Sequence, residues 1–175
     1  MALSVHETVS DRGPSDPRTV FAILANHDVD FVVIGAWAVI AHGSTRNTLD
    51  VDVIAASDHA NLVRLGAALA ELGAERLAAG PKRWGTALDA RTLAEGGNFT
   101  LVTPAGGLDV FKEVPGGASY EQVRARSLPV DLGDGLQIRI AGIDDLIAMK
   151  RAAARPQDLR DIATLTHIER ERRGG

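Results

Sequence analysis

The sequence predicts a single α+β domain, on the basis of three observations. The chain has 175 residues, of which 45% are hydrophobic, so it is long enough for one domain with a substantial core. Short apolar runs typical of strands alternate with segments at helical spacing. Two predicted hairpins and two predicted helices then complete the chain. We expect a flexible polar segment over residues 1 to 16 and one domain over residues 17 to 175.

Each element follows from a local signal. Asp16 and Pro17 suit the N-cap and first position of a helix, whereas Gly35, Gly43 and Gly73 end a strand and two helices. The predicted elements of the first half are helices over 15 to 28, 36 to 43 and 57 to 73, with strands over 29 to 35 and 49 to 56. In the second half they are hairpins over 98 to 114 and 128 to 141, a helical turn over 119 to 127, and helices over 143 to 154 and 156 to 173. Residues 74 to 97 mix turn and helix signals and stay unassigned.

Composition limits the classes of function. Only 4% of residues are aromatic and the formal charge is −4, which disfavours base-stacking platforms and sequence-independent coating of nucleic acid, although a local basic patch is compatible. The absence of cysteine excludes disulfides, thiolate metal ligands and a cysteine nucleophile. No leader-like start and no apolar run of bilayer length is present, so we expect a cytoplasmic protein without membrane partners.

The strand around "LDVDV" carries two aspartates that face the same way. Side chains alternate along a strand, so Leu49, Val51 and Val53 are expected to face the core while Asp50 and Asp52 share the opposite face. A hard cation with oxygen ligands, such as Mg²⁺, would offset the repulsion between the two carboxylates. The other interpretation is that both line the wet face of an antiparallel sheet.

Asp109 is a candidate for a third carboxylate. It alternates with Leu108 and Val110 in the return strand of the first hairpin. If this strand pairs with the D-x-D strand, three carboxylates converge, and such a group can hold one or two metal ions for phosphoryl transfer. Asp109 could also be the general base for an incoming hydroxyl.

Gly35 precedes a predicted helix, and a helix N-terminus with an unobstructed backbone can receive a phosphate. An ordinary turn at the end of a strand is the other interpretation of Gly35.

Other residues near these segments have weaker signals. Ser44 and Arg46, in the loop before the D-x-D strand, could contact phosphate, although an exposed arginine without a function is nearly as plausible. His42 is read as structural, with a general base as the lesser option. Trp37 and Trp84 are read as packing residues.

The stretch "VVIGAWAVIAHGSTRNTLDVDV", together with Asp109, resembles the signature of the polymerase-beta-type nucleotidyltransferase superfamily. The resemblance implies the nucleotidyltransferase fold, a mixed β-sheet flanked by helices with further C-terminal helices. It implies metal-binding roles for Asp50, Asp52 and Asp109, with Mg²⁺ or Mn²⁺ as cofactor and an NTP as substrate. Ala36 departs from the pattern, because the family usually has Gly or Ser there.

The later stretch "GIDDLIAMKRAAARPQDLRDIATL" is similar to the AbiEii-like and MenT-like toxin nucleotidyltransferases, whose pattern Lys150, Arg155, Pro156, Asp158 and Asp161 fill. This similarity implies tRNA 3′ ends as the acceptor and a cognate antitoxin or toxin as a protein partner.

Lys150 also lies on the core-facing stripe of its helix and therefore needs a partner. It could extend to solvent, or reach a triphosphate or a site carboxylate, which we favour. Asp158 suits the helix dipole, and Asp161 is the better candidate to hold Lys150 or Arg155.

The predicted function is transfer of a nucleoside monophosphate from an NTP to an acceptor hydroxyl, with release of pyrophosphate. The candidate catalytic residues are Asp50, Asp52, Asp109 and Lys150, and the candidate nucleotide-binding residues are Gly35, Ala36, Ser44, Arg46, Lys150 and Asp161. An RNA acceptor would need a positive surface around Lys82, Arg83, Arg124 and Arg126. The alternatives are a protein or small-molecule acceptor, or a catalytically degenerate binding module that acts as an antitoxin or regulator.

Overall fold

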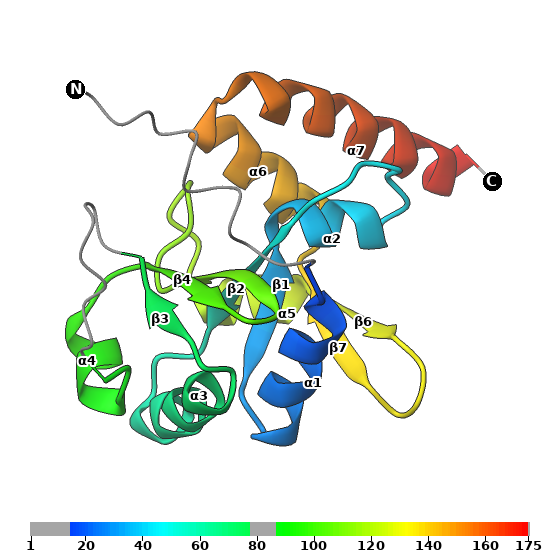
Figure 1. Ribbon diagram of the computed structural model, residues 1–175. Helices are drawn as coiled ribbons and strands as arrows, with labels where there is room; N and C mark the ends of the chain where they lie inside the picture. Colours follow the sequence, from blue (N-terminus) through cyan, green and yellow to red (C-terminus); the bar gives the residue numbers. More distant parts are fainter. Residues whose placement is uncertain (1–14, 78–86, 175) are drawn as a thin grey trace, which may run out of the picture.

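A mixed seven-stranded sheet forms the centre of the protein. The computed structural model describes residues 15–77 and 87–174 (Figure 1). The strand order in the sheet is β3-β4-β5-β2-β1-β7-β6. The strands are β1 (Phe31–Ile34), β2 (Asp50–Ala55), β3 (Glu75–Arg76), β4 (Phe99–Thr103), β5 (Gly106–Phe111), β6 (Leu128–Asp131) and β7 (Gln137–Ile140).

Helices lie on two sides of this sheet. In Figure 1, α6 and α7 pack side by side at the top, with α2 beneath them, whereas α1 and α3 lie together at the bottom. The helices are α1 (Pro17–Asn26), α2 (Gly35–Ala41), α3 (His59–Glu71), α4 (Ala90–Glu95), α5 (Tyr120–Arg126), α6 (Ile143–Ala153) and α7 (Pro156–Gly174). The architecture confirms the predicted α+β class with C-terminal helices. No helix in the described ranges is long and apolar enough to span a bilayer.

The central strands pair in two directions. β2 runs antiparallel to β1 and parallel to β5, which makes the sheet mixed. The predicted pairing between the D-x-D strand and the strand of Asp109 is therefore present. A parallel pair needs a long crossover connection, and the chain between β2 and β5 supplies it through α3, α4, β3 and β4.

Local capping signals position the helices as the sequence predicts. The Asp16 and Asp58 carboxylates accept from backbone amides in the first turns of α1 and α3. Ser119 and Gln122 form a capping box at α5, which makes the predicted helical turn a helix of seven residues. The core between these layers is aliphatic, with Val32, Val33 and similar side chains fully buried.

One expectation needs correction, and two further segments gain detail. Leu49 is 61% exposed instead of sharing the core face with Val51, because β2 begins only at Asp50 and the chain at Leu49 still belongs to the loop. Of the segment expected to be flexible, Asp16 is anchored, since its amide donates to the Ala105 carbonyl at 2.8 Å. Residues 74–97, unassigned from sequence, contain the edge strand β3 and the short helix α4.

Candidate active site

The carboxylates of Asp52 and Asp109 stand on neighbouring strands at the same level of the sheet. Asp52 is the register partner of Asp109 in the parallel β2–β5 pair, and Asp50 is the partner of Gly107. Residues directly opposite in adjacent strands point to the same face, and Asp50 precedes Asp52 by two positions. All three aspartates therefore project from one face, as the alternation in the sequence predicts.

Gly35 lies against Asp52 and has no room for a side chain. It has a φ of +62°, and a Cβ atom at this position would lie 2.0 Å from Oδ2 of Asp52. The next residue, Ala36, donates its amide hydrogen to the Asp52 carboxylate. The glycine that was expected to leave space for phosphate thus has an aspartate as its close neighbour, and the start of α2 binds that aspartate.

Asp52 is a weaker acid than an ordinary aspartate. Burial, followed by the negative charges of Asp109 and Asp50, raises the pKa of Asp52 to about 6. The Ala36 amide and the positive charge of Arg155 oppose this rise in pKa. A buried carboxylate whose neighbours are like-charged is a feature of sites that bind a cation or move a proton.

Arg155 fills a position of the toxin-like pattern, but the sequence did not place it among the candidate catalytic or nucleotide-binding residues. Its charge acts on Asp52, while its Nε donates to Asp158 at 3.0 Å and its side chain stays 64% exposed. The available signal was this pattern, which puts Arg155 just before Pro156, between two helices that pack on each other. Sequence alone does not show that this loop faces the aspartates of the sheet.

Lys150 is buried and held by two carboxylates of α7. Its Nζ lies 2.5 Å from Asp161 and 3.3 Å from Asp158, and all three side chains are at least nine-tenths buried. The prediction that Asp161 holds Lys150 is confirmed. Lys150 contacts these α7 carboxylates instead of those of the sheet. Asp158 also accepts from the Arg155 amide at 3.0 Å, so it caps α7 in addition to binding Lys150.

Arg46 extends this network from the loop before β2. Its guanidinium lies 2.5 Å from Oδ2 of Asp161, the same oxygen that binds Lys150. The Ser44 hydroxyl accepts from the Arg46 amide at 3.4 Å, so it shapes the loop. Arg46 thereby connects the segment that leads into β2 with α7.

His42 and Trp37 are packing residues. His42 is buried, with Nε2 2.8 Å from the Ala141 carbonyl and Nδ1 3.2 Å from Arg172, and burial lowers its pKa. Its structural interpretation is confirmed. Trp37 packs edge to face on Phe21 with ring centroids 6.2 Å apart, as expected of a packing residue.

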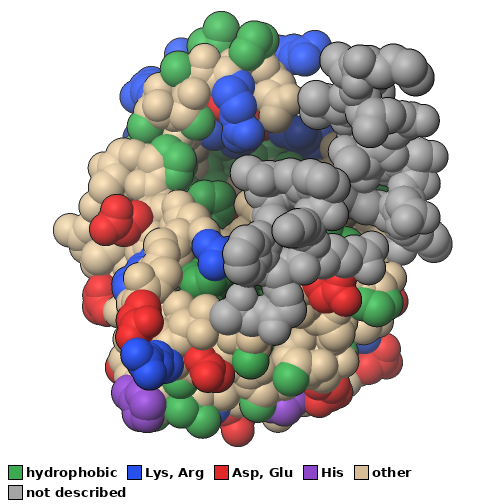
Figure 2. All heavy atoms as spheres, turned by 60° about the vertical axis from the view of Figure 1, so that its left-hand side comes forward, with side chains coloured by type: hydrophobic (Ala, Val, Ile, Leu, Met, Phe, Trp, Pro, Cys, Tyr) green, Lys and Arg blue, Asp and Glu red, His purple; other side chains and the backbone are tan. Residues whose placement is uncertain are grey.

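The basic surface predicted for an RNA acceptor includes residues outside the described ranges. Lys82, Arg83 and Trp84 lie outside the described residues. Arg126 forms an ion pair with Asp145, whereas Arg124 lines a cavity elsewhere on the molecule. Figure 2 instead shows Lys and Arg side chains at the upper rim of a hollow below the α6–α7 layer.

The donor chemistry of the three aspartates fits a divalent cation such as Mg²⁺. Within the described ranges, no group of three or more His, Cys, Asp or Glu side chains is arranged to hold a metal ion. Mg²⁺ usually takes only one or two carboxylates and completes its shell with water and phosphate oxygens. The pair Asp52 and Asp109, whose mutual repulsion a cation would relieve, supplies that number.

The sequence matches no protein-family model and no curated protein at a significant level. The solved structures that resemble this chain include nucleotidyltransferases. The lincomycin-bound lincosamide antibiotic adenylyltransferase LnuA is 16% identical with a TM-score of 0.59, covering 89% of this chain and 99% of that one. The antibiotic-resistance factor ANT(2'')-Ia is 14% identical with a TM-score of 0.56, covering 85% and 80%. A nucleotidyltransferase-like protein from Paracoccidioides brasiliensis is 16% identical with a TM-score of 0.50, covering 87% and 78%. The chain therefore has the nucleotidyltransferase fold.

Proposed function

We propose that the protein transfers a nucleoside monophosphate from an NTP to an acceptor hydroxyl and releases pyrophosphate. The observation that carries this proposal is the in-register pair of Asp52 and Asp109 beside Gly35, on a fold shared with adenylyltransferases. In this reaction the acceptor oxygen bonds to the α-phosphorus, and the bond from that phosphorus to the pyrophosphate oxygen breaks.

Asp52 and Asp109 would hold Mg²⁺ or Mn²⁺, with Asp50 adding negative charge beside them, and the bound cation would supply Lewis-acid stabilisation of the triphosphate oxygens. Asp109, which lies opposite Asp52 on β5, would accept the proton of the acceptor hydroxyl. Asp52 is fixed by the Ala36 amide and is therefore the better anchor for the cation. Because the pKa of Asp52 is about 6, it is ionised in most molecules at pH 7 even without a cation.

The loop between α6 and α7 would stabilise the negative charge of the nucleotide. Arg155 is the exposed cation that acts on Asp52, so it is placed to neutralise a phosphate bound beside that carboxylate. A network of ion pairs would position this loop relative to β2, because it joins α6, α7 and the loop before β2. Its members are Lys150, Asp158, Asp161 and Arg46.

Two acceptor classes have different support. The similarity to toxin nucleotidyltransferases implies the 3′ end of tRNA. A small-molecule hydroxyl is supported by the neighbours, because LnuA is an antibiotic adenylyltransferase with bound lincomycin and ANT(2'')-Ia has been solved in complex with adenylyl-2''-tobramycin. The net charge of −4 favours the small molecule, since RNA binding depends on many phosphate contacts.

The test is transfer of α-labelled phosphate. The protein is incubated with Mg²⁺ and each of four labelled NTPs, in parallel with total tRNA, an aminoglycoside and lincosamide panel, or no added acceptor. Label in the small-molecule fraction or in tRNA identifies the acceptor, and label on the protein itself indicates a protein acceptor. Absence of label in every fraction contradicts the proposed activity.

A binding module without activity is the second candidate, favoured by Ala36 at a position where the family usually has Gly or Ser. Calorimetry separates the two candidates. Mg²⁺-dependent NTP binding that is lost in Asp52→Asn supports the enzyme. The absence of binding at millimolar NTP supports the module.

A further inference from the structure

A polar cavity lies at the other end of β1 from the aspartates. It has a volume of about 560 Å³, within the range of small-ligand sites. Phe31 lines it and pairs with Ala55, whereas Asp52 pairs with Ile34 at the other end of the same strand. Three residue steps along a strand separate the two positions by about 10 Å. The cavity is thus distinct from the candidate active site.

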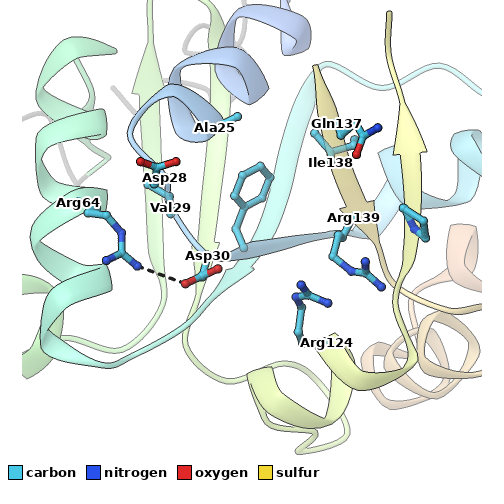
Figure 3. Close-up of a pocket in the computed structure, with 11 residues that line it drawn as sticks. Ala25, Asp28, Val29, Asp30, Arg64, Arg124, Gln137, Ile138 and Arg139 are labelled. Atoms are coloured by element: carbon cyan, nitrogen blue, oxygen red, sulfur yellow. Dashed lines mark hydrogen bonds and ion pairs between the residues drawn. The ribbon is translucent and has the colours of Figure 1, made fainter. Parts of the chain in front are cut away.

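Two arginines face each other across one side of this cavity. Arg124 comes from α5 and Arg139 from β7, and Figure 3 shows their guanidinium groups pointing toward one another. Arg139 is held in place by Ser127, with 2.7 Å from Nε to the hydroxyl and 2.6 Å from its terminal nitrogen to the carbonyl. In the part of the chain that the structure describes, neither arginine forms an ion pair with a carboxylate. Burial, and then the charge of Arg124, lowers the pKa of Arg139.

The opposite side of the cavity carries two carboxylates, Asp28 and Asp30, and one arginine, Arg64. Asp30 pairs with Arg64 at 3.2 Å, as the dashed line in Figure 3 shows. The buried Asn61 fixes the backbone of Asp30, accepting from its amide at 2.7 Å and donating to its carbonyl at 3.1 Å. The floor between the two sides is apolar and includes Phe31 and Ile138. The uncompensated positive charge is therefore confined to the Arg124 and Arg139 side.

We propose that this cavity binds a small organic anion, with its oxyanion group between Arg124 and Arg139 and its organic body over Phe31 and Ile138. A phosphate or carboxylate there would replace repulsion between two guanidinium groups with charge-assisted hydrogen bonds, for which the arginine fork is suited. The volume accommodates more than an inorganic ion, and the apolar floor favours a ligand with a flat or hydrocarbon body.

Phenyl phosphate, benzoate, inorganic phosphate and benzyl alcohol separate the two parts of this proposal. Calorimetry with the full chain should give a dissociation constant on the order of 1 mM or lower for phenyl phosphate or benzoate. Inorganic phosphate should bind more weakly and benzyl alcohol not measurably. Stronger binding of phenyl phosphate than benzoate identifies a phosphomonoester site, and the reverse identifies a carboxylate site.

Substitutions of the two arginines test whether the anion binds in this cavity. Arg124→Gln should weaken phenyl phosphate binding at least about tenfold, and the double variant Arg124→Gln/Arg139→Gln should abolish it. Arg124→Gln leaves the Ser127 contacts of Arg139 intact, so its fold can be checked by circular dichroism. Arg91→Gln, an exposed arginine of α4, is the matched control and should bind like the unmodified protein. Absence of anion binding, or binding unchanged in Arg124→Gln, overturns the proposal.

Discussion

Asp109 lies directly opposite Asp52 on the neighbouring parallel strand, and both carboxylates face the same side of the sheet. This relationship brings together two residues that are far apart in the sequence. It also stores electrostatic repulsion, which is part of the reason that the pKa of Asp52 rises to about 6. The consequences of this pair, and of the charged network beside it, can be measured.

Replacing Asp52 with Asn should stabilise the protein at neutral and alkaline pH. The folded-state pKa of about 6 lies above the ordinary value of 3.8, so the ionised form destabilises the fold above pH 6. This destabilisation shrinks as the pH falls from 6 toward 3.8 and is absent below that. The free energy of unfolding of Asp52→Asn should therefore exceed that of the unmodified protein by about 1 to 3 kcal/mol at pH 8, and the two should be equal at pH 3.5. Thermal melting at the two pH values tests this, and an equal gain at both contradicts it. Asp134→Asn, in an exposed pair with Arg18, is the control.

Gly35→Ala should lower the free energy of unfolding by more than the positive φ of Gly35 alone explains. A methyl group at Gly35 would lie 2.0 Å from Oδ2 of Asp52, whereas Gly117, with a φ of +76°, has nothing within 4 Å of the same added atom. We expect Gly117→Ala to cost about 1 kcal/mol and Gly35→Ala about 3 kcal/mol or more, with loss of the Asp52 position. Urea unfolding measures both free energies. Equal losses of unfolding free energy in the two variants would contradict this prediction, because they would show that Asp52 moves away from the added methyl group without cost.

Lys150→Met should destabilise the fold strongly, because it leaves Asp158 and Asp161 with one fewer buried partner. Their other contacts, to Arg155 and Arg46, limit the loss in unfolding free energy to about 3 kcal/mol. The adjacent Arg151 is exposed, so Arg151→Met should change stability by less than about 0.5 kcal/mol. If the two variants unfold at the same urea concentration, the proposed role of Lys150 in joining α6 and α7 is wrong.

Arg155→Gln should raise the pKa of Asp52 further. The positive charge of Arg155 favours the ionised carboxylate, so removing it favours the protonated form. A carbon-13 NMR titration of the Asp52 carboxyl group follows this directly. Arg160→Gln, an exposed change one turn into α7, should leave the titration unchanged. An Asp52 titration midpoint that does not move in Arg155→Gln refutes the electrostatic contact.

The strands that carry the aspartates were predictable because strand alternation is a local property. Period-two alternation around Asp50, Asp52 and Asp109 fixes which side chains share a face, and Gly35 marks where β1 ends. Leu49 shows the limit of this reasoning. Its apolar side chain continues the pattern by one residue beyond the strand, because backbone pairing and not periodicity determines where β2 begins.

The partners of the charged residues could not be predicted with the same certainty. Lys150 was placed on a buried stripe correctly, but its two partners depend on how α7 packs on α6. Arg155 acts on Asp52 through a tertiary arrangement that no local pattern encodes. The edge strand β3 has only two residues, both exposed, so no periodicity marks it in the sequence.

The most direct test of the account is transfer of α-labelled phosphate from NTP by the unmodified protein, Asp52→Asn, Asp109→Asn and the control Asp134→Asn, each with Mg²⁺ and with EDTA. We predict transfer by the unmodified protein and the control only when Mg²⁺ is present, and at least about a thousandfold less by the two aspartate variants. Transfer that persists in Asp52→Asn, or that EDTA does not affect, would contradict the central role of the Asp52 and Asp109 pair.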